Sequence, residues 1–241
     1  MKKFKLIRSG LQSASFNMAL DEKIFNQYLE DRIPVFRVYG WKNPSFTYGF
    51  SQTPDDEINL DRCIACNVEV VKRITGGGIL FHWHEITYSF ACSKEDINEP
   101  EGLLVGYRSI CRFLLDFYKK LNLEAKFSVE LDSFLNKNFP HELCCASHEK
   151  YDVTISGKKI GGNAQKRKRD CIFQHGSIPF SIDWKLLESY LKKMPLGIKE
   201  NVTSLSEQFS SLPERNILED KLIDSFSDNF GVEFYETSLV K

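Results

Sequence analysis

The sequence predicts an α+β fold, in which a mixed, largely antiparallel sheet is flanked by helices. Three observations support this prediction. Long segments with apolar residues at helical spacing lie at 13–31 and 102–123. Runs rich in β-branched and aromatic residues, which are typical of strands, lie between the helical segments. The segment 151–167 carries a Ser-Gly pair between two such runs, and this pattern is typical of a hairpin.

The helices are predicted by the recurrence of apolar residues. In 13–31, large apolar residues recur at every fourth position from Phe16 to Tyr28, with polar residues on the opposite face. In 102–123 they recur at helical spacing from Leu103 onward. The shorter helices that we expect are 56–66, 183–194 and 213–230.

The strands are predicted from composition and from the turn residues that bound them. Runs of this kind occupy 4–8, 34–41, 43–52, 68–74, 79–92 and 171–180. Residues 125–145 follow neither pattern and receive no assignment. Because helices alternate with hairpins rather than with single parallel strands, we expect few parallel pairs in the sheet.

The composition is that of one globular domain. The chain has 241 residues, 42% of them hydrophobic, and a net charge of −1. We therefore expect a single domain over 1–241 with no accessory domain after it. The balanced charge argues against a protein that coats nucleic acid or an anionic membrane. No stretch approaches the roughly 20 apolar residues of a membrane-spanning helix.

The seven cysteines predict a cytoplasmic protein. Their number is odd, and the N-terminus lacks the apolar run of a signal peptide, so we expect reduced thiols. Cys63 and Cys66 have the spacing of half a zinc site or of a redox pair. No second pair follows at zinc-finger spacing, and no helix starts at Cys63, so we interpret both as buried structural thiols. The sequence predicts no metal site.

The glycine-rich segment KRITGGGILFH (72–82) carries the first functional signal. Three consecutive glycines after a strand allow the backbone to approach a ligand and to present its N–H groups to an anion or a carboxyl-derived group. Arg73 adds charge and His82 adds a donor or acceptor. The segment is not a P-loop, because the ending Gly-Lys-Ser/Thr is missing. It is not a dinucleotide fingerprint either, because GxGxxG and the helix that follows it are missing. A plain glycine-rich bend between strands is the alternative interpretation.

The second signal lies in SGKKIGGNAQKRKRDCIFQHGSI (156–178). On a strand, Lys158 and Lys159 point to opposite faces, so one of them faces inward, toward a ligand carbonyl or phosphate. His175 ends a strand and either faces a ligand or forms a hydrogen bond in the core. The basic run 166–169 is either a solvated face or a docking surface for an acidic partner.

Three motifs together resemble the lipoate–protein ligase A and octanoyltransferase family, the lipoyl branch of the biotin/lipoyl protein ligase fold. They are KRITGGGILFH, GKKIGGNAQKR and HGSI, in the family's order and spacing. SFNMALDE (15–22) is a weaker match. The resemblance implies a mixed sheet flanked by helices with a bent tunnel for a medium-length acyl chain. It also implies an enzyme that moves an octanoyl or lipoyl group to the ε-amine of a lysine in a lipoyl domain.

The resemblance also implies roles for particular residues. Lys159 would bind the acyl carbonyl and stabilise the tetrahedral intermediate. The residues that would hold the head of the acyl group or of the acyl-adenylate are Arg73, Gly76, Gly77, Gly78 and His82. Those that would line the pocket are Gly162, His175, Tyr39 and Trp41. Asp152 occupies the place of the family's Asn-Asp pair, which in ligases helps to position nucleotide phosphates and Mg²⁺, although the Asn is Tyr151 here.

The family contains two chemistries, and the sequence favours one of them. Cys144 lies fifteen residues before Lys159, the spacing of a transferase branch in which a cysteine takes octanoyl from acyl carrier protein as a thioester. We favour this route, in which no cofactor is tightly bound, although Cys144 and Cys145 are also open to interpretation as ordinary thiols. The unbroken Gly76–Gly78 run resembles the ATP- and Mg²⁺-dependent ligases, which form lipoyl-adenylate. A non-catalytic lipoate-binding module is a further alternative.

The expected partners follow from the same resemblance. The acceptors are lipoyl domains of 2-oxoacid dehydrogenases or the glycine-cleavage carrier protein, and the donor in the favoured route is octanoyl–acyl carrier protein. We expect a monomer that binds neither nucleic acid nor membrane.

Overall fold

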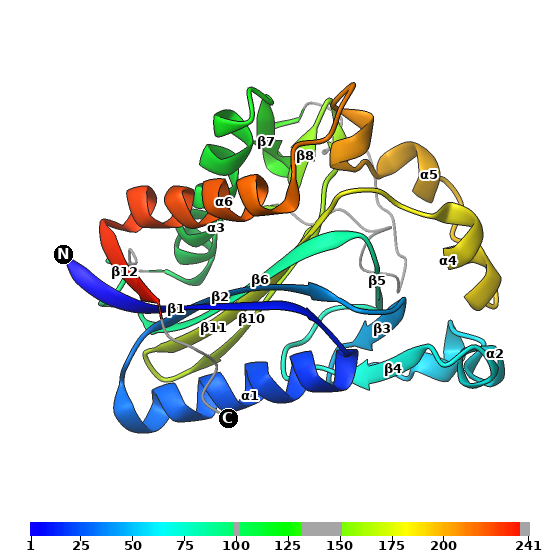
Figure 1. Cartoon of the computed structure of the whole chain (residues 1–241), viewed down its shortest axis with the longest axis horizontal. Helices are drawn as coiled ribbons and strands as arrows, with labels where there is room; N and C mark the ends of the chain where they lie inside the picture. Colours follow the sequence, from blue (N-terminus) through cyan, green and yellow to red (C-terminus); the bar gives the residue numbers. More distant parts are fainter. Residues whose placement is uncertain (99–101, 132–150, 237–241) are drawn as a thin grey trace.

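The computed structural model describes residues 1–98, 102–131 and 151–236. A six-stranded sheet forms the centre of the molecule, with α1 on one face and with α3 and α6 on the other (Figure 1). Its strands, in spatial order, are β10 (Gly162–Lys168), β11 (Cys171–Pro179), β6 (Glu85–Ser93), β2 (Val35–Trp41), β1 (Lys2–Gln12) and β12 (Val232–Glu236). The pairs from β10 to β2 are antiparallel, whereas β1 runs parallel to both β2 and β12. The predicted mixed, largely antiparallel sheet is confirmed.

The three long helices form where the sequence predicts them: α1 (Ala14–Asp31), α3 (Leu103–Lys120) and α6 (Arg215–Phe230). Helix α1 begins at Ser13, whose side chain accepts a hydrogen bond from the backbone N–H of Phe16, and it ends at Arg32 in the left-handed region with a φ of 59°. Helices α3 and α6 pack together over the sheet, where the rings of Phe36 and Phe226 lie 4.5 Å apart. This aromatic core holds the sheet rigid beneath the site.

Two small sheets stand beside the central one, and one of them belongs to the glycine-rich segment. It contains β3 (Ser45–Tyr48), β4 (Glu69–Lys72) and β5 (Leu80–His82). Helices α2 (Leu60–Ala65), α4 (Trp184–Tyr190) and α5 (Ile198–Asn201) pack around it in a second hydrophobic cluster. Helices α2 and α4 are shorter than predicted: Pro54–Asp56 forms a separate 3₁₀ turn, and the chain leaves α4 at Leu191 to bridge with Ile58.

The other small sheet contains β7 (Ala125–Phe127), β8 (Val153–Ile155) and β9 (Lys158–Lys159). The predicted hairpin is confirmed at the turn between β8 and β9, where Ser156 and Gly157 both have positive φ. The prediction of one continuous second arm is wrong, because the chain breaks at Gly161 and continues as β10 in the central sheet. Gly161 has a φ of +77°, and a Cβ there would lie 2.0 Å from the carbonyl oxygen of Ser177. Only glycine fits this break.

Two further differences from the prediction lie in β1 and β12. Strand β1 is longer than 4–8 and contains a register shift between Arg8 and Leu11, beside Gly10 at a φ of +61°. Strand β12 was not predicted; it follows α6 through Gly231, whose φ is +62°, and pairs with β1 at the sheet edge. In the part of the chain that is described, no helix is long and apolar enough to cross a membrane.

Candidate acyl-transfer site

Lys159 is buried at the break between the small sheet and the central sheet. Its side chain is 2% exposed, and its Nζ lies 2.7 Å from Oδ2 of Asp152, which is 6% exposed. The antiparallel pairing of β8 and β9 brings the two residues together, because Asp152 immediately precedes β8. Lys158 is half-buried on the opposite side of the strand. The expectation that one lysine faces inward is confirmed, and that lysine is Lys159.

The glycine loop, by which we mean residues 75–79, is folded around the guanidinium of Arg73. This side chain is buried; its Nη2 donates to the carbonyl oxygens of Gly76 at 2.8 Å and Gly78 at 2.5 Å, and its Nε donates to that of Gly76 at 3.2 Å. Gly77 has a φ of +87°. Gly49 also shapes the loop, since a Cβ there would lie 2.1 Å from the carbonyl oxygen of Gly77. Sequence reasoning missed Gly49, which lies in a segment assigned only as strand and turn.

His175 lies in the middle of β11 and not at the end of a strand as predicted, because the pairing with β6 continues to Pro179. It is buried between α1 and the glycine loop. Its Nε2 lies 2.7 Å from Oγ1 of Thr75, at the start of the loop, and its Nδ1 lies 3.5 Å from Oδ2 of Asp21 on α1. Burial lowers the pKa of His175 and outweighs the opposing effect of Asp21. Burial alone would raise the pKa of Asp21, but the charge of Arg37 together with hydrogen bonds from His175 and Ser89 lowers it below its usual range. The site therefore contains a neutral imidazole beside an ionised carboxylate.

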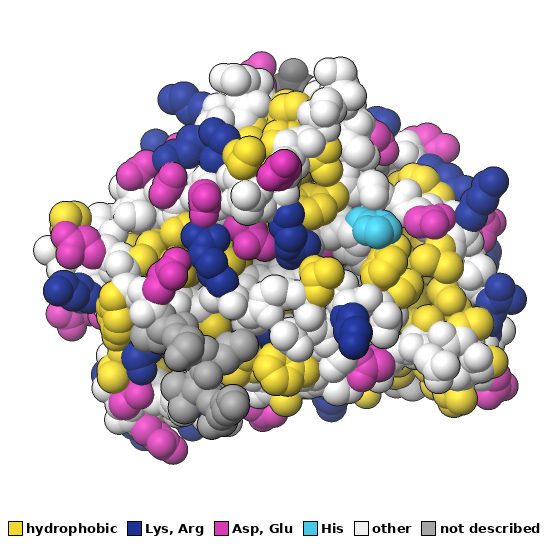
Figure 2. Space-filling model, in the orientation of Figure 1, with side chains coloured by type: hydrophobic (Ala, Val, Ile, Leu, Met, Phe, Trp, Pro, Cys, Tyr) yellow, Lys and Arg dark blue, Asp and Glu magenta, His cyan; other side chains and the backbone are white. Residues whose placement is uncertain are grey.

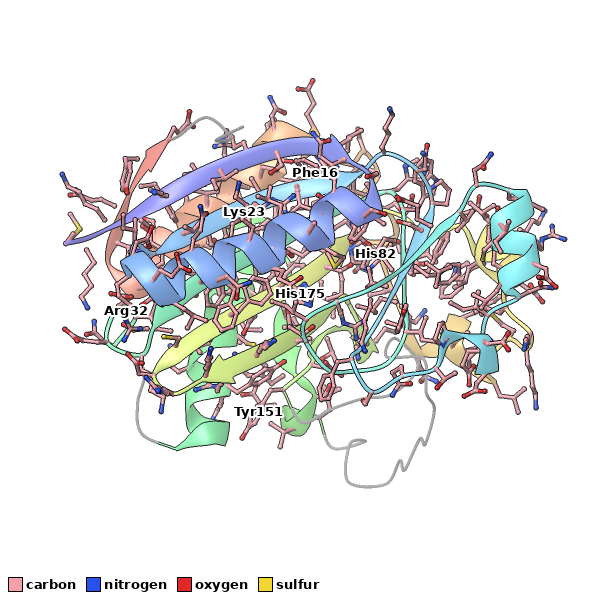
Figure 3. The ribbon with its side chains drawn as sticks, turned by 90° about the horizontal axis from the view of Figure 1, so that it is seen from below. Phe16, Lys23, Arg32, His82, Tyr151 and His175 are labelled. Atoms are coloured by element: carbon pink, nitrogen blue, oxygen red, sulfur yellow. The ribbon has the colours of Figure 1, made fainter. Side chains whose placement is uncertain are left out.

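His82, at the end of β5, contacts a threonine hydroxyl and a carboxylate, as His175 does. Its Nε2 lies 2.7 Å from Oγ1 of Thr47, and its Nδ1 lies 2.9 Å from Oε1 of Glu85. The ring of Trp41 stacks on the imidazole with centroids 3.9 Å apart and an interplanar angle of 15°. Figure 3, seen from the α1 side, labels His82 and His175. The sequence analysis did not identify Asp21, Glu85, Thr47 or Thr75 as site residues. Thr75 lies inside the motif KRITGGGILFH and Asp21 inside the weaker match SFNMALDE, so both were within reach of the resemblance.

Two adjoining pockets connect these groups. The inner pocket contains most of the predicted binding residues, and its lining includes Tyr39, Trp41, Arg73, His82, Gly162 and His175. The outer pocket contains Lys159 beside apolar side chains, among them Leu80, Phe81, Trp83, Trp184 and Leu187. Leu80, Gly162 and Ser177 line both pockets. The two pockets therefore adjoin, with Lys159 in the outer one and the stacked pair of Trp41 and His82 in the inner one.

The outer pocket opens on a partly apolar surface. Figure 2 shows hydrophobic side chains gathered on the side of the molecule where α4 and β5 lie. Gly76 faces a third, open depression on another side, which is lined in part by Phe50, Lys72 and Lys166. Cys144 lies outside the described residues. Asp152, which the resemblance connects with nucleotide phosphates and Mg²⁺, is paired with Lys159.

Comparison with known proteins identifies the family. Residues 13–230 match the model of the lipoyl protein ligase A/B catalytic domain. The chain belongs to this family. Within it, the chain is 35% identical over 237 residues to octanoyltransferase LipM of Bacillus cereus, covering 95% of this chain and 85% of that protein. It is 30% identical over 253 residues to octanoyltransferase LipM of Clostridioides difficile, covering 99% and 91% of the two chains.

A solved structure supports the fold of this family member. The bi-partite lipoate protein ligase of Thermoplasma acidophilum superposes with a TM-score of 0.79 at 20% identity, over 100% of this chain and 89% of that one. The fold expected from the motif resemblance, that of a lipoyl protein ligase, is therefore confirmed. The family membership is independent of this superposition, because it follows from the sequence match over most of the chain.

Proposed function

We propose that this protein is an octanoyltransferase of protein lipoylation, which moves an octanoyl group from octanoyl–acyl carrier protein to a lysine ε-amine of a lipoyl domain. The observation that carries the proposal is 35% identity to an octanoyltransferase over 95% of the chain. The adjoining pockets that contain Lys159 and Trp41 support it, because an acyl chain needs an enclosed channel with a polar group at one end.

Lys159 is proposed to act on the acyl carbonyl. A buried ammonium at the junction of the two pockets is suited to donate a hydrogen bond to the carbonyl oxygen and to stabilise the negative charge that develops on it. Asp152 holds the Nζ group of Lys159 in place through this contact.

Cys144 is proposed as the acyl carrier of the enzyme, on the basis of its spacing from Lys159. In the first step its sulfur forms a bond to the acyl carbon, the bond to the donor sulfur breaks, and the proton of Cys144 ends on the released carrier thiol. In the second step the acceptor amine forms the amide, the bond to Cys144 breaks, and a proton of the amine returns to the cysteine sulfur. Both steps balance without an oxidant, a reductant or a hydrolysed nucleotide.

The inner pocket is proposed to hold the acyl chain. Its wall contains Met18, Tyr39 and Trp41, while Leu80 and Gly162 line both this pocket and the outer one. The cytoplasm is proposed as the compartment of the reaction, with which the five free thiols among the described residues are compatible.

Intact mass spectrometry tests the proposal. Incubation with octanoyl–acyl carrier protein should add about 126 Da, the mass of an octanoyl group that replaces a thiol hydrogen. The adduct should disappear in Cys144→Ser and persist in Cys66→Ser, which removes a thiol at the C-terminal end of α2. The prediction that Cys66 is buried is wrong: it is exposed where the helix ends, whereas Cys63 is buried as predicted. Addition of an unmodified lipoyl domain should then transfer the mass to that domain. A wild-type protein that neither gains the mass nor modifies the domain would contradict the proposal.

The unbroken Gly76–Gly78 run favours a second candidate, ATP-dependent lipoate ligation, because it resembles the ligase motif. Its signature is pyrophosphate release in the presence of lipoate, with activity retained in Cys144→Ser. Comparison of the two assays with and without ATP separates the candidates.

A further inference from the structure

Two buried chains of interacting side chains, each made of a carboxylate, a histidine and a threonine, converge on the glycine loop. Each runs from a carboxylate to Nδ1 of a histidine, and from Nε2 of that histidine to a threonine hydroxyl. We infer that Asp21 and Glu85 are positioning residues, which act through these two chains to hold the glycine loop in its acyl-binding shape. The inference deepens the proposed function, on which its kinetic test rests.

The first chain joins α1 to the start of the loop. Asp21 accepts a hydrogen bond from the hydroxyl of Tyr39 at 2.8 Å and is paired with Arg37 at 2.7 Å, so it is fixed and ionised. An ionised carboxylate can only accept, so the proton of the neutral His175 ring is on Nδ1, which faces Asp21. Nε2 is then the acceptor, and Thr75 donates its hydroxyl proton to it over 2.7 Å.

The second chain joins β6 to the guanidinium inside the loop. Oε1 of Glu85 accepts hydrogen bonds from Nε1 of Trp41 at 2.9 Å and from Thr87 at 2.6 Å, and it faces Nδ1 of His82. Oε1 of Glu85 is surrounded by donors, so Nδ1 of His82 donates to it, and Nε2 of the same ring faces the hydroxyl of Thr47 at 2.7 Å.

Thr47 joins the ring of His82 to the guanidinium of Arg73. Arg73 can only donate, so the Thr47 oxygen accepts from Nη1 of Arg73, which lies 3.3 Å away, and its proton is available to Nε2 of His82. The same guanidinium holds the carbonyl oxygens of Gly76 and Gly78. One chain therefore fixes the start of the loop at Thr75, and the other fixes the cation around which the glycines fold.

Asp21 is in the lining of neither pocket and acts through its partners, whereas Glu85 acts through His82 and also borders the outer pocket that contains Lys159. Glu85 also accepts a hydrogen bond from Ser177, which lines both pockets, at 2.9 Å. Substrate binding should therefore respond to changes in either chain, although the acyl carbonyl is placed at Lys159.

Hydroxyl deletion tests the inference with the least disturbance of the core. Thr75→Val keeps the shape of the side chain but removes the donor to His175. We expect amide hydrogen exchange in residues 75–79 to become faster and KM for octanoyl–acyl carrier protein to rise about tenfold, which corresponds to one lost buried hydrogen bond. Thr75→Ser restores the hydroxyl and should restore both values. Thr53→Val is the control, because Thr53 is exposed and its side chain caps no backbone group.

The role of the two carboxylates is tested with Asp21→Asn and Glu85→Gln. In Asp21→Asn the amide oxygen stays at the Oδ1 position, which faces Arg37 and Ser89, so the NH₂ group faces Nδ1 of His175 and reverses the tautomer of the ring. In Glu85→Gln the amide oxygen stays at the Oε1 position, which accepts from Trp41, so the variant removes only the negative charge that His82 and Trp41 face. We expect faster exchange at 75–79, with kcat changed less than KM. Asp21→Asn also weakens the contact with Arg37, and Thr75→Val decides the question if that variant does not fold.

The outcomes separate this inference from the proposed function. Unchanged exchange at residues 75–79 in both Thr75→Val and Glu85→Gln would overturn the inference, as would a Thr75→Ser variant as defective as Thr75→Val. Hydrogen exchange is measured on the protein without donor or acceptor. It therefore measures the stability of the loop even if the wild-type protein transfers no octanoyl group.

Discussion

Lys159 and Asp152 form an ion pair that is almost completely withdrawn from water, with Nζ 2.7 Å from Oδ2 and side-chain exposures of 2% and 6%. The pair lies where β9 leaves the small sheet, immediately before the chain enters the central sheet as β10. A buried charge of this kind is costly to desolvate, and Lys159 lines the outer pocket.

Lys159→Met should abolish most of the activity. Loss of one group that stabilises the developing oxyanion typically lowers kcat roughly 100- to 1,000-fold, which the octanoyl-transfer assay would detect. The same substitution removes the ammonium beside the buried carboxylate of Asp152 and should lower the free energy of unfolding by about 3–5 kcal/mol.

The double variant Lys159→Met/Asp152→Leu separates chemistry from folding. Replacement of both charges by apolar groups should recover much of the stability in urea unfolding but none of the activity. Recovery of octanoyl transfer in the double variant would show that Lys159 has no role in the reaction.

Stability should fall with decreasing pH because of His175. Burial lowers its pKa from the usual 6.5, so the unfolded chain binds a proton more readily than the folded protein does. The contribution of the neutral ring is fully present above pH 6.5 and is lost as the pH falls from there toward the lowered pKa. The charged or titratable groups that face the ring are Asp21, Arg73 and His82.

This expectation is checked by the melting temperatures of the wild type and of His175→Gln, measured from about pH 7.5 to about pH 5. The variant should show a shallower loss of stability in that interval. His84→Gln provides the control, because His84 is exposed. Parallel curves for His175→Gln and the wild type would refute the assignment.

Gly161→Ala should destabilise the protein more than Gly157→Ala. Both glycines have a φ of +77°, so alanine at either position carries roughly 1–2 kcal/mol of backbone strain. A Cβ at Gly161 would also meet the carbonyl oxygen of Ser177 at 2.0 Å, whereas nothing lies within 4 Å of a Cβ at Gly157. Urea unfolding of the two variants measures the difference, and equal losses would contradict the argument.

Gly161→Ala should also lower octanoyl transfer, because the break at Gly161 directs Lys159 to the outer pocket. The turn at Gly157 can shift without moving the β10–β11 pairing, so its variant should retain most of its activity. The transfer assay, run on folded fractions of both variants, tests this difference.

Trp41→Phe should weaken the inner pocket through a lost hydrogen bond. Phenylalanine can still stack on His82, but it cannot donate to Oε1 of Glu85 or to Oγ1 of Thr87, which Nε1 of Trp41 contacts at 2.9 and 2.7 Å. Removal of one donor from a buried carboxylate typically costs about 1–3 kcal/mol. Thermal unfolding gives the stability loss, and donor titration should show a higher KM. An unchanged melting temperature and KM would exclude this role for the indole N–H.

Much of the fold follows from local patterns. Helices α1, α3 and α6 and the strands of the central sheet other than β12 lie in segments that the sequence predicts. The helices show a long apolar periodicity, and the strands are rich in β-branched and aromatic residues, and both signals are local. Strand β12 has only five residues, whose sequence V-E-F-Y-E lacks strict alternation, and it exists through its pairing with β1, a contact that no local pattern reveals. The break of the second hairpin arm was missed for a related reason: Gly161 is required by its approach to Ser177, which is distant in sequence.

The amino-acid order by itself determined the family and that one of Lys158 and Lys159 faces inward, because motifs and strand alternation are encoded by neighbours along the chain. Through the resemblance it also indicated some of the residues of the inner pocket. Only the tertiary structure decided the partners of those residues. Asp21 and His175 are 154 positions apart (175 − 21) and are joined by the packing of α1 on the sheet, and Thr47 reaches His82 only because β3 and β5 pair. Long-range hydrogen bonds of buried groups depend on which surfaces pack together, and that is a property of the folded chain as a whole.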